Sequence, residues 1–204
     1  MILFGHLGLG LKMSRPLMGK EPSPLPLKWL LIGTLFPDLI DKPLYYGLRL
    51  IQGPDGAALH LISGTRTFGH TALFLLLLAI VAIVTKSRAI AAVSLGVATH
   101  LLLDHLGDSI GHAIWPSTDV IQYDERGRNL SLVGLLWPFL GNRLPVNLHR
   151  NIIEHARTFV FRPHIWIGEI IGFLFLMRDQ GKDQRIWDRL WKRAYSPFRP
   201  KSSS

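Results

Sequence analysis

Five residues that could bind a metal ion or move a proton fall within thirteen positions of one apolar stretch, "ATHLLLDHLGDSIGHAIWPS" at 98–117. They are His100, Asp104, His105, Asp108 and His112. His100 and Asp104 are four residues apart, so on a helix their side chains share one face. An imidazole and a carboxylate in this arrangement can ligate one metal ion, and the carboxylate can bridge two. His105 points about 100° away from Asp104, and we expect Asp108 and His112 beyond the helix end.

Further candidate ligands occur in other parts of the chain. Asp38 and Asp41, at i and i+3 after Pro37, project to a common side of a helix, His70 precedes the longest apolar run, and His6 lies in the first. The chain has no cysteine, so any metal must be held by His, Asp or Glu. Ionisable groups in an apolar bundle cost on the order of several kcal/mol unless paired or metal-bound, which makes these residues functional candidates.

Each candidate also has an ordinary explanation when taken alone. Polar residues at helix ends are commonly solvated at the headgroup level of a membrane, and a single histidine in a helix is more often a hydrogen-bonded core residue than a ligand. The combination of five such residues at one place favours a metal site over these explanations. The five are His6, Asp38, His70, His100 and Asp104.

The elements that must position these residues are apolar runs typical of helices. The chain has 204 residues, of which 48% are apolar and 18% charged, and almost no alternating pattern indicates strands. Residues 72–84 are all apolar, and with their flanks they approach the roughly 20 residues that cross a bilayer. The polar "TKSR" at 85–88 and a second run at 89–106 predict an antiparallel helical hairpin. Further runs occupy 1–11, 25–40, 130–140 and 164–177, and the glycine-rich 51–69 is expected to be a loop.

The hairpin predicts which candidate ligands meet. Residues that precede its first helix and residues near the end of its second helix must lie at the same end, so His70 is expected close to His100 and Asp104. Asp38 and Asp41 lie at the far end of the run that begins near Lys28 and should join them. His6 could reach the same layer.

Two architectures remain open at this point: a small membrane-embedded bundle, and a soluble helical protein with an unusually apolar core. The unbroken run at 72–84 and its flanking basic residues favour the membrane. The predicted fold is therefore all-α, a small multi-pass membrane helical bundle with a central antiparallel helical hairpin. The positive-inside rule then places the basic segments on the cytoplasmic face. Their charges come from Lys12, Arg15, Lys20, Lys28, Lys86, Arg88 and the C-terminal tail.

The net charge of +9 is concentrated near the C-terminus, where residues 178–204 hold eight Lys or Arg against three Asp. We predict a membrane-embedded helical domain over 1–178 and a basic amphipathic cytoplasmic tail over 179–204. In this tail two tryptophans alternate with arginines at helical spacing, which favours a lipid surface over nucleic acid. An ordinary solvated amphipathic helix is the alternative. The residues concerned are Ile186, Trp187, Leu190 and Trp191 opposite Arg185, Arg189, Lys192 and Arg193.

Four motifs give the chain a family resemblance. "FGHLGLG", "GTLFPDLIDKP", "GTRTFGHTALF" and "HLLLDHLGDSIGHAIWP" occur in this order over about residues 1–117. They resemble the membrane-bound metal-dependent hydrolase family, also called LexA-binding, inner-membrane-associated hydrolases. That family is distantly similar to the zinc-dependent phospholipase C and nuclease enzymes, which are helical and hold several metal ions with His and Asp.

The resemblance implies a site residue by residue. Asp38, His70, His100 and Asp104 would surround one metal ion, and Asp104 would also reach a second ion held by His6. Asp41 would join either ion or support a ligand, and Arg66 would hold a phosphate or a carboxylate. A third ion, as in the phospholipase group, would need a His and a Glu from further along the chain. His112, His149, Glu154 and His155 are available. Their spacing does not match the pattern of the phospholipase group.

The function expected from the resemblance is hydrolysis of a phosphoester by a metal-activated water at the inner membrane. Asp104 and Arg66 would be the catalytic residues, and a phospholipid or a lipid-linked molecule would be the substrate. Zinc suits these ligands, and manganese or iron is also compatible, with one or two ions per chain. The alternative from another class is a non-enzymatic membrane scaffold or regulator-binding protein whose His/Asp cluster is structural. A transporter with a His/Asp relay is a third possibility.

Overall fold

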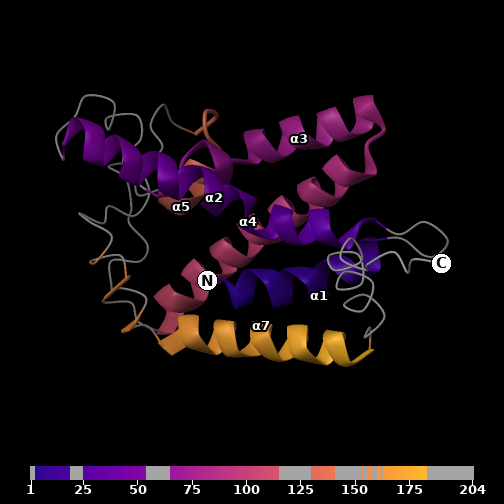
Figure 1. Ribbon diagram of the computed structural model, residues 1–204. Coiled ribbons are helices and arrows are strands. Elements are labelled where there is room, and N and C mark those ends of the chain that lie inside the picture. The colour runs from indigo at the N-terminus through magenta and orange to yellow at the C-terminus, as the bar shows by residue number, and fades with distance from the viewer. Residues whose placement is uncertain are drawn as a thin grey trace, which may run out of the picture.

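The computed structural model describes residues 3–18, 25–53, 65–114, 130–140 and 163–182, with a few positions between 153 and 161. These residues form helices and turns, and no strand is found among them, as the all-α prediction requires. The elements in chain order are η1 (Gly5–Leu9), α1 (Gly10–Ser14), η2 (Arg15–Leu17), α2 (Leu27–Gln52), η4 (Phe68–His70), α3 (Ala72–Thr85), α4 (Arg88–Ile114), α5 (Leu130–Leu135) and α7 (Pro163–Lys182). Figure 1 shows their arrangement.

The predicted helical hairpin is present as α3 and α4 (Figure 1). Thr71 is the N-cap of α3, and its hydroxyl accepts a hydrogen bond from the backbone N–H of Phe74 at 3.0 Å. Lys86 ends it in the left-handed conformation, with a φ of 52°. Ser87 then accepts a hydrogen bond from the N–H of Ile90, which starts the return helix. The turn therefore reverses the chain within three residues, and it presents two basic side chains.

The second helix of the hairpin is longer than the sequence indicated. We expected Asp108 and His112 beyond its end, but α4 continues to Ile114 and both positions lie inside it. The expectation was wrong, because the helix continues through Gly107 and the polar residues that follow it. A glycine costs a helix interior only about 1 kcal/mol, which is too little to end a helix whose apolar positions continue.

Helix α2 also extends past the predicted run at 25–40 and ends only at Gln52. Two prolines, Pro37 and Pro43, lie inside it. Each removes one backbone donor without ending the helix. Asp38 and Asp41 consequently lie near its middle rather than at its end.

Close backbone contact holds α2 against α4 at the centre of the bundle. A Cβ added at Gly33 would collide with the backbone of Val93, and one added at Gly96 would collide with the backbone of Leu30. The two helices can therefore cross only where neither has a side chain. This contact brings the Thr34 carbonyl of α2 within reach of α4.

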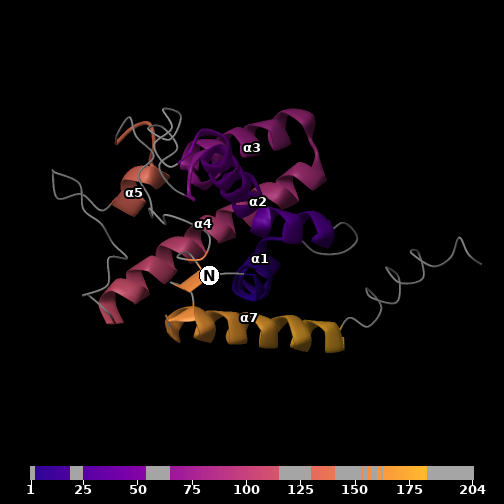
Figure 2. The ribbon, with the colours of Figure 1, turned by 60° about the vertical axis from the view of Figure 1, so that its left-hand side comes forward.

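The N-terminal helical segment and α7 lie side by side in both ribbon views (Figures 1 and 2). Gly8 and Gly172 are in backbone contact, the Phe4 and Phe173 rings meet edge to face at 5.4 Å, and Arg15 pairs with Asp179 at 2.8 Å. These contacts hold the N-terminal segment against α7 from residue 4 to residue 15. The apolar core next to them contains Leu11, Leu30 and Ala92.

One helix in the described part of the chain is long and apolar enough to cross a membrane, over Arg88–Gly111 of α4. Helix α3 is apolar but shorter. Large apolar side chains on α3 and α7 are nevertheless exposed, among them Ile83 at 75% and Leu174 at 58%. Of the predicted tail, 179–182 belong to α7, and 183–204 lie outside the described residues.

Candidate metal centre

The seven sequence-predicted site residues are brought together between α2, η4, α4 and the N-terminal turn. His6, Asp41, His70, His100 and Asp104 are buried, and Asp38 and Arg66 are half-buried. As the hairpin geometry predicted, His70 at the start of α3 meets His100 in α4, with their Nε2 atoms 3.1 Å apart. The structure thus confirms that the residues converge, and their role as ligands stays a prediction.

Each of these two histidines has its other nitrogen committed as a donor. His70 Nδ1 lies 2.7 Å from Asp41 Oδ2, and His100 Nδ1 lies 2.8 Å from the Thr34 carbonyl oxygen. A carbonyl and a carboxylate only accept, so both Nδ1 atoms carry the proton and both Nε2 atoms of the neutral rings carry a lone pair. Two lone pairs 3.1 Å apart repel each other unless a cation lies between them.

Asp41 positions His70 and the segment before it. Its two carboxylate oxygens accept backbone N–H groups from Thr67 at 2.7 Å, Gly69 at 3.0 Å and His70 at 3.2 Å, besides the His70 ring. With all these donors on one carboxylate, Asp41 supports a ligand rather than facing the cluster itself.

Asp38 and Asp104 face the two Nε2 atoms from opposite helices. Asp38 Oδ1 lies 3.5 Å from His70 Nε2, and Lys42 holds its other oxygen at 2.6 Å. Asp104 Oδ2 lies 3.6 Å from the Nε2 atoms of both His70 and His100. Ligands about 2.0–2.1 Å from a tetrahedral zinc ion lie roughly 3.3 Å from one another. The spacing therefore fits one metal ion held by Asp38, His70 and His100, with Asp104 Oδ2 next to the two histidines.

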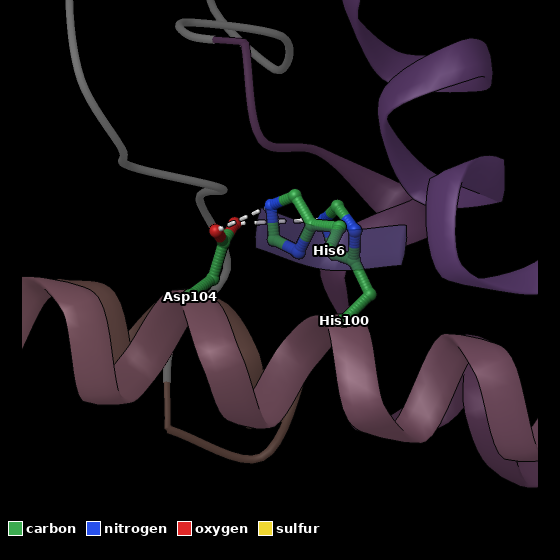
Figure 3. A group of neighbouring side chains, drawn as sticks. All are labelled: His6, His100 and Asp104. Atoms are coloured by element: carbon green, nitrogen blue, oxygen red, sulfur yellow. Dashed lines mark ion pairs between the residues drawn. The ribbon is translucent and has the colours of Figure 1, made fainter. Parts of the chain in front are cut away.

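His6 adds a second group of donors around the other oxygen of Asp104 (Figure 3). Its ring stacks on that of His100 at 4.0 Å between centroids, and its Nε2 lies 3.3 Å from Asp104 Oδ1. Neither ring nitrogen of His6 has an aligned hydrogen-bond partner in the described part of the chain, although the residue is fully buried. Buried polar atoms are almost always satisfied, so this ring is poised for a ligand.

The two groups that could each hold a metal are His6, His100 and Asp104, and Asp38, His70 and His100. His100 belongs to both, but its Nδ1 is occupied by Thr34, so its single free lone pair can serve only one ion at a time. Asp104 has no such restriction because its two oxygens point to different groups. Asp104 is thus the residue that can bridge.

Arg66 is paired with two carboxylates of its own chain. Its guanidinium contacts Asp104 Oδ2 at 3.1 Å and forms a two-pronged pair with Asp108. Burial alone would lower the pKa of Arg66, but the charges of Asp104 and Asp108 raise it, so the guanidinium stays charged. Arg66 therefore orients Asp104 toward the histidines.

The charges of the cluster do not balance. Asp38, Asp41, Asp104 and Asp108 supply four negative charges, and Lys42 and Arg66 supply two positive ones, so two negative charges remain if the imidazoles are neutral. Burial alone would lower the pKa of His70, but hydrogen bonds to Asp38 and Asp41 and the charge of Asp104 raise it. These surroundings select a positive charge at His70 Nε2, either a proton or a divalent ion.

A small pocket opens beside the cluster, between the 66–70 segment, α4 and α5. Its wall includes Arg66, His70, Asp104, His105 and Leu135. His105 was expected to point away from Asp104, and it lies on the wall of the pocket rather than among the ligands. Asp104 and Arg66 thus border a small opening at the edge of the cluster.

Sequence reasoning missed two residues that bear on this centre. The Thr34 carbonyl, which orients His100, belongs to the backbone and leaves no signal in the sequence. Glu169 in α7 accepts hydrogen bonds from the N–H groups of residues 3–5, next to His6. It could have been noticed as the one acidic residue in the run at 164–177, since an ionisable group in an apolar helix is a functional candidate.

The structure does not describe the side chains of the residues that were considered as ligands of a third ion. His149, Glu154 and His155 lie outside the described residues, and His112 is described only as a backbone position in α4.

Comparison with protein families agrees with the resemblance of the sequence motifs. The family model described as YdjM inner membrane protein matches residues 1–181. The match extends past residue 117, where the recognisable motifs end, and includes α5 and α7. No curated protein and no solved structure matches the chain.

Proposed function

The chain belongs to the YdjM inner membrane protein family, a family of membrane-bound metal-dependent hydrolases, and from this membership we propose that it hydrolyses a phosphoester with a divalent metal held by its buried His/Asp cluster. The observation that carries the proposal is the pair of Nε2 atoms of His70 and His100, 3.1 Å apart with both Nδ1 atoms engaged as donors. Zinc suits this donor set, and manganese and iron(II) are compatible with it.

The ligands proposed for the first ion are Asp38, His70, His100 and Asp104, with His6 and the second oxygen of Asp104 available for another. A bound divalent ion supplies Lewis-acid chemistry, which lowers the pKa of water from 15.7 toward about 7 and offsets charge that develops on a phosphoryl oxygen. Asp41 and Thr34 fix the two imidazoles so that Nε2 faces the cluster. Asp104, held by Arg66, presents one oxygen to each group.

The substrate is proposed to enter by the pocket beside Asp104. Arg66 lies on its wall, where Asp104 and Asp108 already balance its charge, so the attraction for an anionic group such as a phosphoester would come from the bound divalent ion. Leu101 and Leu135 supply apolar surface on the same wall. A phosphoester with an apolar portion, such as a phospholipid or a lipid-linked molecule, suits this lining.

The hydrolysis is tested with metal-stripped and reloaded protein in detergent. We expect the purified protein to cleave a phosphodiester or phospholipid, to lose this activity after chelation, and to recover it on addition of zinc or manganese. Assays should cover both a soluble chromogenic phosphodiester and mixed micelles of phospholipid. A reloaded protein that binds metal but cleaves neither class of phosphoester would refute the proposed chemistry and favour a scaffold.

The membrane arrangement is a second part of the proposal. The turn of the α3–α4 hairpin and the C-terminal end of α7 point to the same side of the bundle in both ribbon views (Figures 1 and 2), and the end of α1 points to that side in Figure 1. Basic residues lie at these ends, among them Lys12, Lys86 and Arg178. The positive-inside rule supports a cytoplasmic location for this side and a multi-pass arrangement for the bundle. Because α3 is 14 residues long, the metal cluster at its start lies about 21 Å from the turn, in the opposite half of a bilayer whose hydrocarbon core is about 30 Å thick.

This orientation predicts the labelling of introduced cysteines, which the cysteine-free chain makes easy to read. Ser87→Cys in the hairpin turn should react with a membrane-impermeant maleimide only after the inner membrane is opened. Leu50→Cys, at a position 87% exposed near the end of α2, should react in intact spheroplasts. Labelling of both cysteines from the same side of the membrane would contradict the arrangement.

A further inference from the structure

Glu169 is a buried carboxylate in the middle of an otherwise apolar stretch of α7. It is 7% exposed, and Ile167, Ile170 and Ile171 beside it are exposed on the outer surface of the helix. Its Oε2 accepts the backbone N–H groups of Leu3 at 3.0 Å and Phe4 at 2.8 Å. Its Oε1 accepts the N–H of Gly5 at 3.1 Å. One side chain therefore holds three consecutive backbone groups that are more than 160 residues away in the sequence.

The three N–H groups belong to the start of the N-terminal helical segment. The first backbone donors of a helix have no partner within the helix, and a negative charge there is favoured by the helix dipole. No side chain of the segment itself caps this end, since Phe4 is the residue before η1. Glu169 supplies the missing acceptors from α7, and the lack of a Cβ at Gly8 and Gly172 lets the two backbones approach closely.

His6 follows directly after the three residues that Glu169 holds. It lies in η1, a π-helical turn, a conformation that is frequent at functional sites. On its other side the His6 ring is stacked on His100 and faces Asp104 Oδ1. The rotation of this turn, and with it the direction of the His6 ring, is fixed at one end by Glu169.

We propose that Glu169 is a positioning residue that sets the register of the His6 turn and so controls binding of the metal ion held by His6 and Asp104. The inference rests on the metal centre proposed above. It assigns α7 a role in the centre although no α7 side chain belongs to either ligand group in the described residues.

The test compares Glu169→Gln with His6→Ala and with a matched control, Asp179→Asn. Asp179 joins the same two segments through Arg15, at the end away from His6. Zinc affinities are measured on full-length protein in detergent by competition with a chromophoric chelator, and cobalt(II) absorption reports the ligand environment. His6→Ala identifies the ion that depends on His6. We expect Glu169→Gln to weaken binding of that ion by about tenfold or more, to change its cobalt spectrum, and to leave the other ion and the helix content unchanged. Asp179→Asn should bind both ions as the wild type does.

Three results would overturn the inference alone. The first is wild-type affinity at the His6-dependent ion in Glu169→Gln, and the second is an equal loss of all ions, which would indicate a general effect on folding. The third is a His6→Ala variant that binds as many ions as the wild type. A wild-type protein that binds no metal would overturn the proposed function as well, so the two failures can be told apart. If Glu169→Gln does not fold, Glu169→Asp, which keeps the charge, is titrated in the same way and should show a smaller loss.

Discussion

Replacing Asp104 with alanine is expected to leave the protein folded and without bound metal. Among the described residues, Asp104 is the carboxylate with an oxygen directed to each of the two groups of histidines, at 3.3 Å from His6 and 3.6 Å from His70 and His100. Its loss removes a ligand and a negative charge from both groups at once. Losing a residue that only supports a ligand costs about 10- to 100-fold in metal affinity, and losing a shared ligand should cost more. Hydrolysis should fall to background.

Asp108→Ala is the matched control for this variant. Asp108 pairs with the same Arg66 guanidinium and lies one helical turn further along α4, but it belongs to neither group of candidate ligands. We expect Asp108→Ala to keep its metal. Fold is checked by circular dichroism in both variants, and Asp104→Asn, which keeps the volume of the side chain, replaces the alanine variant if that does not fold. Unchanged metal stoichiometry in both Asp104 variants would refute the bridging role.

Replacing Asp41 with alanine is expected to give a large loss of stability. Asp41 is fully buried and accepts three backbone N–H groups and the His70 ring. Each buried donor left without a partner costs about 1–3 kcal/mol, so the free energy of unfolding should fall by at least about 3 kcal/mol. In a chain of this length that corresponds to a decrease in Tm of roughly 6–12 °C. Metal affinity should also fall, because His70 loses the acceptor that orients it.

The loss is measured as Tm in detergent, with and without added zinc. Leu39→Ala is the control, because Leu39 lies two residues away on α2 and is 59% exposed. We expect its Tm to be close to that of the wild type. Asp41→Asn should fall between the two, since an amide oxygen accepts some of these hydrogen bonds whereas its NH₂ group cannot. An Asp41→Ala variant as stable as Leu39→Ala would show that the hydrogen bonds of Asp41 do not hold the 67–70 segment.

The sequence allowed the hairpin and the meeting of His70 with His100 and Asp104 to be predicted, because both follow from local features. An apolar run, a short polar turn and a second run impose antiparallel helices, and antiparallel helices bring the start of one to the end of the other. The ends of α2 and α4 were harder to predict. The apolar runs stop short of the helices, which continue through two prolines and a glycine because burial of the apolar faces against the rest of the bundle outweighs their cost of about 1–3 kcal/mol each.

The residues that orient the candidate ligands could not be predicted from the sequence in the same way. Thr34 acts on His100 through its carbonyl, which every residue has, and only the contact at Gly33 and Gly96 brings it close. Glu169 lies more than 160 residues from the N–H groups that it holds, so no spacing pattern connects them. Arg66 was expected to hold a phosphate or a carboxylate, and the structure shows it paired with Asp104 and Asp108.

The central claim is that a divalent metal, rather than a shared proton, lies between His70 and His100. Elemental analysis of the wild-type protein, purified in detergent without a histidine tag and without added metal, tests it most directly. We expect zinc, manganese or iron at one or two ions per chain, removable by a chelator with a decrease in Tm. A folded protein that contains no metal, takes up none on incubation with zinc, and has the same Tm in chelator would contradict the claim, because a proton would then satisfy the two Nε2 atoms.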